Sequence, residues 1–66
     1  MQIDTNTVKA KMLERGYSVK ELAQKADLAY ITISRAINHE KDFSYKTVAR
    51  ISKALDCKPT DLIQES

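Results

Sequence analysis

The sequence contains very few of the residues that build tight turns, disulfides and metal sites. It has one glycine and one proline among 66 residues, which leaves little material for hairpin turns and favours helices. A single cysteine excludes an internal disulfide, and a single histidine excludes a clustered metal site. A chain this short buries only roughly 60% of its unfolded surface, so its stability must come from close packing and well-capped helix ends.

Long apolar segments and recognisable catalytic groups are also missing. No apolar run approaches the ~20 residues that cross a bilayer, and no segment reads as a secretion signal. Together with the lone Cys57, which suits a reducing compartment, this predicts a single cytoplasmic domain over residues 1–66. There is no catalytic carboxylate pair, glycine-rich loop or metal-ligand spacing, so we expect neither enzyme activity nor a cofactor.

The charges are distributed unevenly along the chain. The formal net charge is only +2, but residues 1–53 hold ten Lys or Arg against six Asp or Glu. Residues 54–66 hold one lysine and three acids. The basic surplus in the first four fifths of the chain is a mild indication of a nucleic-acid-binding face, and many ordinary soluble domains share it.

Caps and apolar spacing predict two helices in the first part of the chain. The first begins within Asp4–Asn6 and ends at Gly16, which can adopt the left-handed conformation that closes a helix. Ser18 and Glu21 have the spacing of a capping box and begin the second helix. The inner side of the first helix is expected to comprise Val8, Met12 and Leu13; that of the second comprises Val19, Leu22, Ala23 and Ala26.

A tight turn follows the second helix. Asp27 tolerates turn geometry, and only two or three residues separate it from the next apolar pattern. That pattern predicts a third helix with Ala29, Ile33, Ala36 and Ile37 on its inner side. Two helices joined so closely must cross at a steep angle, which is the DNA-binding helix-turn-helix arrangement but also that of an ordinary helical corner.

Two more helices are predicted after a polar loop over residues 38–43. Ser44 is expected to cap a fourth helix, whose inner positions are Val48, Ile51 and Leu55. The segment Lys58-Pro59-Thr60-Asp61 then opens a short fifth helix, since Pro59 suits the first helical position and Asp61 suits the positive first turn. The sequence therefore predicts a compact all-α fold of five helices.

The outward side of the third helix carries groups that can read bases. If Ile33 points inward, Ile31 and Arg35 point away from the core, flanked by Thr32, Ser34 and Asn38. Arginine pairs with guanine O6 and N7, and an apolar side chain can contact the thymine methyl. The alternative is a solvated face, but such faces usually carry Glu and Lys, and Ile31 would then need another explanation, such as a protein contact.

At this point a family resemblance is evident. Residues 18–38 read SVKELAQKADLAYITISRAIN and resemble the Cro/CI-type (Xre-like) helix-turn-helix of phage repressors and small bacterial regulators. The resemblance includes the Leu22-Ala23 pair, the stretch 32–35, and the downstream run from Val48 to Ile63, and it extends over about residues 5–63. The sequence departs from the family pattern at Asp27 and Ala29, and where His39 and Glu40 follow Asn38.

The resemblance implies a lambda-repressor-like fold of five helices, with the recognition helix at about residues 29–38 in the major groove. Carried over by position, the base-reading residues are Tyr30, Ile31, Thr32, Ser34 and Arg35. For Tyr30, partial burial in the core is an equal alternative. The phosphate-binding residues are Ser18, Val19, Asn38, Lys41, Ser44, Tyr45 and Lys46.

The expected function is that of a sequence-specific regulator of transcription that binds double-stranded DNA, a repressor or Cro-like switch, bacterial or phage-encoded and nucleoid-associated. The alternative is a helix-turn-helix module that binds a protein, as an antitoxin or antirepressor does. A homodimer on a pseudo-palindromic operator would use the surface around the fifth helix and the tail, where Leu62 and Ile63 are not both expected to be buried.

Overall fold

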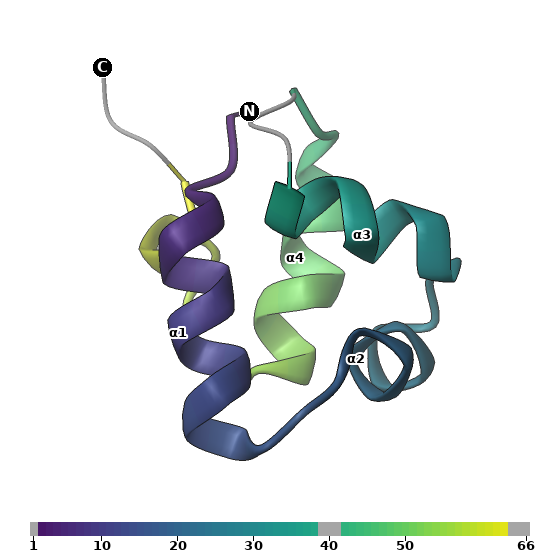
Figure 1. Cartoon of the computed structure of the whole chain (residues 1–66). Helices are drawn as coiled ribbons and strands as arrows, with labels where there is room; N and C mark the ends of the chain where they lie inside the picture. The colour runs from purple at the N-terminus through teal and green to yellow at the C-terminus, as the bar shows by residue number, and fades with distance from the viewer. Residues whose placement is uncertain (1, 39–41, 64–66) are drawn as a thin grey trace.

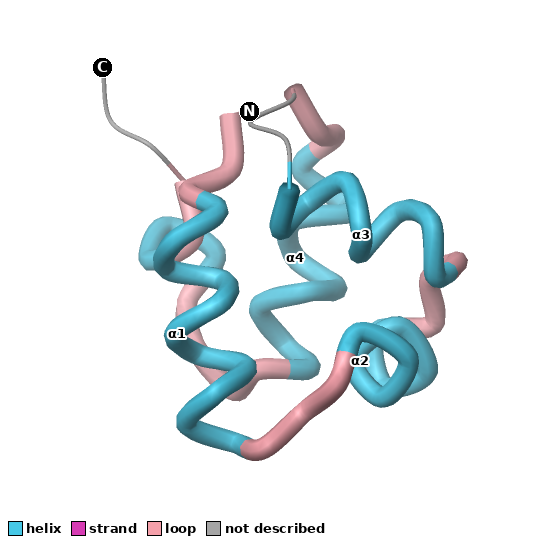
Figure 2. Tube along the Cα trace, viewed as in Figure 1, coloured by secondary structure: helices cyan, strands magenta, loops and turns pink. Residues whose placement is uncertain are grey.

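Four α-helices follow one another along the described part of the chain, residues 2–38 and 42–63 of the computed structural model. Figure 1 shows their arrangement, and Figure 2 shows that loops join them without strands between the described residues. The helices are α1 (Thr5–Arg15), α2 (Val19–Ala26), α3 (Tyr30–Asn38) and α4 (Tyr45–Ala54), followed by the 3₁₀ turn η1 (Pro59–Asp61). The predicted all-α class is confirmed, and none of the described helices is long and apolar enough to cross a membrane.

The prediction of a fifth helix is wrong. Pro59 does occupy the first position of η1, but this turn is only three residues long. It is held by short-range bonds from Asp61 N to Lys58 O (2.9 Å) and from Leu62 N to Pro59 O (3.0 Å). The backbone then turns to the other end of the chain, where the Leu62 carbonyl accepts a bond from Asp4 N at 2.6 Å. That pairing uses the residues that a longer helix would need.

Three of the α-helices are preceded by a residue whose side chain accepts hydrogen bonds from backbone N–H groups of the first turn. The Asp4 carboxylate accepts two backbone bonds in the first turn of α1. The capping box at α2 is present in both directions, from Glu21 N to Ser18 Oγ (3.2 Å) and from Ser18 N to Glu21 Oε1 (3.3 Å). At α4, Ser44 Oγ accepts from Thr47 N at 3.3 Å. Each predicted cap is therefore confirmed, and such caps contribute about 1 kcal/mol each.

The ends of α1, α2 and α4 share one geometry. Each is followed by a residue with positive φ: Gly16 (69°), Asp27 (57°) and Asp56 (55°). In each, the next N–H reaches back to a carbonyl in the last turns: Tyr17 N to Met12 O, Leu28 N to Ala23 O, and Cys57 N to Ser52 O, at 2.9–3.0 Å. This is the Schellman pattern, which satisfies the last carbonyls and reverses the chain within a few residues.

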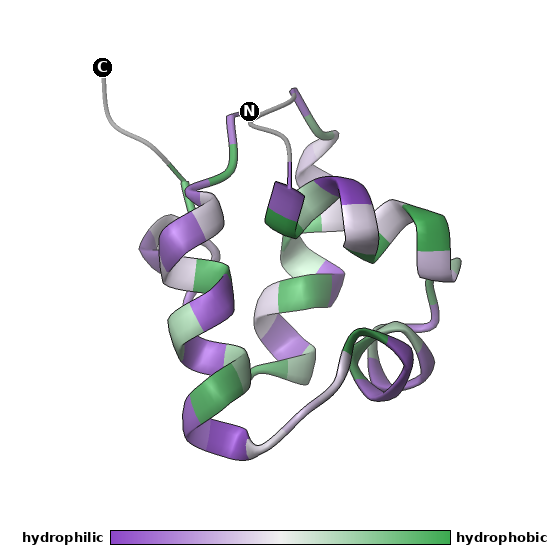
Figure 3. Cartoon of the chain, viewed as in Figure 1, coloured by the Kyte–Doolittle hydropathy of each residue, from purple (hydrophilic) through white to green (hydrophobic). Residues whose placement is uncertain are grey.

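The core lies where the four helices meet, and most predicted inner positions are confirmed. α3 packs against α1 and α2, and α4 packs against α2 and η1. Figure 3 shows that apolar and polar residues alternate along each helix, as expected for helices with one buried side. The buried cluster comprises Ile3, Val8, Met12, Leu22, Ala23, Ile33, Ala36, Val48, Ile51, Leu55 and Leu62.

Two of the expected inner residues are instead exposed. Leu13 is 82% exposed, because Val8 and Met12 take the core-facing side of α1 and the next position turns about 100° away from it. Ala29 is also exposed, since it precedes the first residue of α3. Its carbonyl accepts the first backbone bond of that helix, from Thr32 N at 3.0 Å.

The left-handed turn at Asp27 gives a test of backbone strain. This conformation costs an L-residue roughly 1–2 kcal/mol, less for Asp, and costs glycine nothing. We expect Asp27→Gly to raise the free energy of unfolding by several tenths of a kcal/mol up to about 1 kcal/mol, because greater freedom in the unfolded chain offsets part of the gain. Asp27→Ala is expected to lower it by about 1 kcal/mol.

Urea unfolding followed by far-UV circular dichroism measures both changes. Asp27→Asn serves as the matched control, since it removes the charge while keeping a residue that tolerates the left-handed region. A lower free energy of unfolding for Asp27→Gly than for the wild-type protein would show that the backbone at this position is not strained.

Candidate nucleic-acid interface

The second and third helices cross at a steep angle, as predicted. In Figure 1, α2 is seen nearly along its axis, whereas α3 runs across the view. Only residues 27–29 join them. Two contacts hold the corner: Ala23, which is 95% buried, allows the helices to approach closely, and Arg50 Nη1 from α4 donates to the Asp27 carbonyl at 3.3 Å. α4 thereby fixes the position of the turn from which α3 begins.

α3 has one buried side and one exposed side. Ile33 and Ala36 are fully buried, so they anchor the helix in the core. Ile31 is 55% exposed, and Arg35 and Asn38 are exposed as well. These positions are three or four residues apart and therefore lie along one face. The outward orientation predicted for Ile31 and Arg35 is confirmed.

The other predicted base-reading residues occupy the flanks of this face. Thr32 and Ser34 are half-buried, at the border between the exposed and buried sides. Tyr30 is 60% exposed and does not belong to the core cluster, so the alternative of core burial is wrong. Asn38 Nδ2 donates to Ser34 Oγ at 3.3 Å, which fixes these two polar groups relative to one another.

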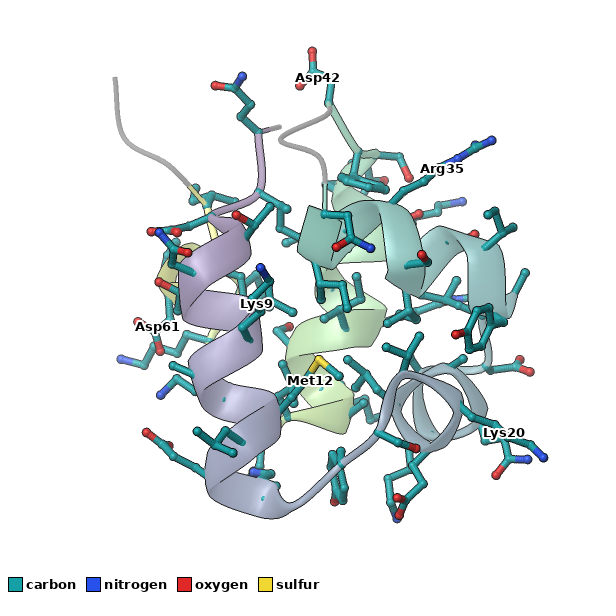
Figure 4. All side chains as sticks on the ribbon, viewed as in Figure 1. Lys9, Met12, Lys20, Arg35, Asp42 and Asp61 are labelled. Atoms are coloured by element: carbon teal, nitrogen blue, oxygen red, sulfur yellow. The ribbon has the colours of Figure 1, made fainter. Side chains whose placement is uncertain are left out.

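The guanidinium of Arg35 is uncommitted within the described part of the chain, where it has no ion pair or hydrogen bond. It projects outward from α3, and Lys20 projects outward from α2 on the same side of the molecule, away from α1 (Figure 4). A cation held on a rigid helix without a partner among the described residues can pair with an external acceptor, such as a base edge or a phosphate.

The start of α2 has the predicted capping box, and the phosphate contacts of Ser18 and Val19 stay a prediction. Both the hydroxyl oxygen and the N–H of Ser18 take part in the capping box, so this residue's polar atoms are already engaged. Val19 is half-buried. Its N–H and that of Lys20 belong to the first turn, where backbone donors have no partner within the helix. Lys20, which sequence reasoning missed, adds an exposed cation there, and its position as the second helical residue was the available signal.

The start of α4 presents a similar arrangement. Ser44 Oγ lies 3.0 Å from Thr47 Oγ1 and caps the helix, while Tyr45 is 66% exposed and Lys46 is exposed. The first turn thus offers backbone N–H groups and a cation side by side, a combination that suits an anion. The predicted contact at Lys41 lies outside the described residues.

The charge on these elements has one sign. α3 and α4 together carry four cationic residues and no carboxylate: Arg35, Lys46, Arg50 and Lys53. Two acidic residues of the C-terminal region lie elsewhere: Asp56 pairs with Arg15 of α1 at 3.4 Å, and Asp61 lies beyond α1, far from Arg35, in Figure 4. The helices α3 and α4 themselves therefore add no repulsion toward a polyanion, although the exposed Asp42 precedes α4 and lies at the top of the view in Figure 4.

Cys57 has the packing role predicted for it. It is half-buried, and burial raises the pKa of its thiol above the usual value, which is the opposite of what a nucleophile needs. Within the described ranges, no group of three or more His, Cys, Asp or Glu residues is placed to hold a metal ion.

A short turn between steeply crossing helices, with the second helix exposed along one face, is the arrangement of a helix-turn-helix, which an ordinary helical corner shares. The profile of the Cro/C1-type HTH DNA-binding domain matches residues 7–64, and the chain belongs to this family. Comparison with curated proteins gave no match, and comparison with solved structures gave none either.

The salt dependence of DNA binding tests the placement of Lys46. If its ammonium neutralises a phosphate, Lys46→Ala should weaken binding on all sequences alike and reduce the slope of log K against log salt by about 1. Lys9→Ala is the matched control, because Lys9 is an exposed lysine on α1 (Figure 4). Fluorescence anisotropy on duplex DNA across a salt series measures both slopes. Equal slopes for the two variants would remove Lys46 from the interface.

Proposed function

We propose that this protein is a sequence-specific regulator of transcription that binds double-stranded DNA and acts as a repressor or Cro-like switch. The observation that carries the proposal is the two-sided α3. Ile33 and Ala36 lock one side into the core, while Ile31, Arg35 and Asn38 form an exposed side that contains no carboxylate. A helix held this way fits the major groove, which is wide enough to admit it.

The proposed roles follow from position and chemistry. Arg35 pairs with guanine through O6 and N7, the commonest specific contact. The other base-reading residues are Tyr30, Ile31, Thr32 and Ser34, of which the half-buried ones act from the flanks. The proposed phosphate-binding residues at the start of α2, the end of α3 and the start of α4 are Ser18, Val19, Lys20, Asn38, Ser44, Tyr45 and Lys46. Lys41, which lies outside the described residues, is added to this set from the sequence alone. Ser18 acts mainly by holding the start of α2 in shape.

Specificity requires two copies, since one recognition helix reaches only a few base pairs. Of the two apolar residues expected at the joining surface, Leu62 is fully buried, whereas Ile63 is only partly buried against the core. We therefore propose that two copies bind adjacent half-sites of a pseudo-palindromic operator, and that any apolar contact between them near η1 uses Ile63 and not Leu62.

The alternative function is a helix-turn-helix module that binds a protein, as an antitoxin or antirepressor does. The 55% exposure of Ile31 favours it, because an exposed branched side chain on a helix face also suits a protein contact. The two functions differ in what Arg35 does, since only a base reader discriminates between DNA sequences.

Arg35→Ala tests the proposal directly. We expect this variant to lose about 1–3 kcal/mol of binding free energy for the preferred site and to relax specificity at one base pair. The preferred site is first selected from a randomised duplex pool, and anisotropy then measures both proteins on that site and on its single-base variants. Arg15→Ala is the matched control, because Arg15 pairs with Asp56 at 3.4 Å and lies on α1.

Unchanged discrimination in the Arg35 variant would remove Arg35 from the reading role. Failure of the wild-type protein to retain any duplex from the pool, even at low salt, would favour the protein-binding alternative.

A further inference from the structure

Large apolar side chains are exposed at few places in the described ranges, and most of these places are helix starts. The residues are Leu13 (82%), Tyr30 (60%), Ile31 (55%) and Tyr45 (66%). Leu13 is in the last turn of α1, whereas the other three occupy the first or second position of α3 or α4. Figure 3 shows apolar colouring in the first turn of α3. Single exposed apolar residues are ordinary. Tyr30, Ile31 and Tyr45, however, all lie on α3 or α4, the helices that contact DNA in the proposed function.

Ile31 differs from its neighbours on the exposed side of α3 in what it can contact. Ser34 and Asn38 are hydrogen-bonded to each other at 3.3 Å, and the Arg35 guanidinium can donate to a base. Ile31 can neither donate nor accept a hydrogen bond. The apolar feature that distinguishes one base pair from another in the major groove is the C5 methyl group of thymine. An isoleucine directed at base edges can therefore select only for such a group.

We propose that Ile31 makes this protein a reader of pyrimidine C5 methyl groups. Its preferred half-site then contains a methylated pyrimidine close to the guanine that Arg35 contacts. This inference rests on the proposed function and deepens it. The chemical feature recognised is the methyl group itself, so thymine and 5-methylcytosine both supply it.

The spacing of the two residues sets where the methyl group lies. Ile31 and Arg35 are one helical turn apart on the same face, which corresponds to about 6 Å along α3. Base pairs stack about 3.4 Å apart. The methylated pyrimidine is thus expected one or two base pairs from the guanine contacted by Arg35.

Replacement of thymine by deoxyuridine removes the methyl group and leaves every hydrogen-bonding edge unchanged. In the site selected from the randomised pool, each thymine is replaced in turn and binding is measured by anisotropy. We expect one thymine per half-site, within two base pairs of the Arg35-dependent guanine, to give about fourfold weaker binding as uracil. A factor of about four is what the burial of one methyl group against an apolar surface contributes to binding.

The Ile31→Ala variant shows whether this side chain is responsible. It is expected to fold normally, since Ile31 is half exposed and alanine favours helices, and circular dichroism checks this. The variant should bind the thymine and uracil duplexes equally, and Ile31→Val should retain part of the difference. In a second pair of duplexes with cytosine at this position, 5-methylcytosine should tighten binding by wild-type protein and have no effect on Ile31→Ala.

Three results would overturn the inference. If every thymine can be replaced by uracil without loss while Arg35→Ala still relaxes specificity, the protein reads DNA but not the methyl group. If the difference persists in Ile31→Ala, another side chain reads the methyl group. If wild-type protein selects no site, the proposed function fails and this inference fails with it.

Discussion

The exposed surface of this protein depends on how α3 is anchored. Ile33 and Ala36 are fully buried, and this fixes the rotation of α3 about its own axis. A rotation by one residue, about 100°, would move Arg35 toward the core and expose an apolar position. The alanine at position 36 also matters, because a small side chain allows α3 to lie close to the rest of the core. The arrangement of Ile31, Arg35 and Asn38 is therefore set by residues that never reach the surface.

The turns after α1, α2 and α4 each need a residue with positive φ, but the chain has only one glycine. Gly16 closes α1, but Asp27 and Asp56 adopt positive φ to close α2 and α4 in the same way. Aspartate tolerates this conformation better than most residues, so the fold obtains three sharp reversals at modest strain. At Asp27 the carbonyl also accepts the bond from Arg50. The corner between α2 and α3 is thus held by backbone geometry and by one side chain from α4.

The parts of the structure that were predictable from the sequence are those set by neighbouring residues. The capping box of Ser18 and Glu21, the cap at Ser44 and the inner positions Val48, Ile51 and Leu55 follow from spacing alone, and so does the exposure of Ile31 and Arg35. Leu13 and the length of the last helix were not predictable in this way. The exposure of Leu13 depends on which neighbouring positions α1 buries. The length of the last helix depends on the backbone bond from Asp4 to Leu62, two residues far apart in the sequence. Lys20 was missed although its position as the second residue of the second helix could be read from the sequence; only its place on the same side of the molecule as Arg35 needed the three-dimensional arrangement.

The pairing between the two ends has a consequence for the order in which the fold can be completed. Ile3 is fully buried, and its backbone pairs with that of Ile63, near the other end of the chain. Contacts this distant in sequence carry the largest loop-closure entropy, so they form after local helices have brought their ends together. On a growing polypeptide, Ile3 has no backbone partner until residue 63 has been added, by which time all of α1 to α4 has been synthesised. The edge of the domain therefore closes last.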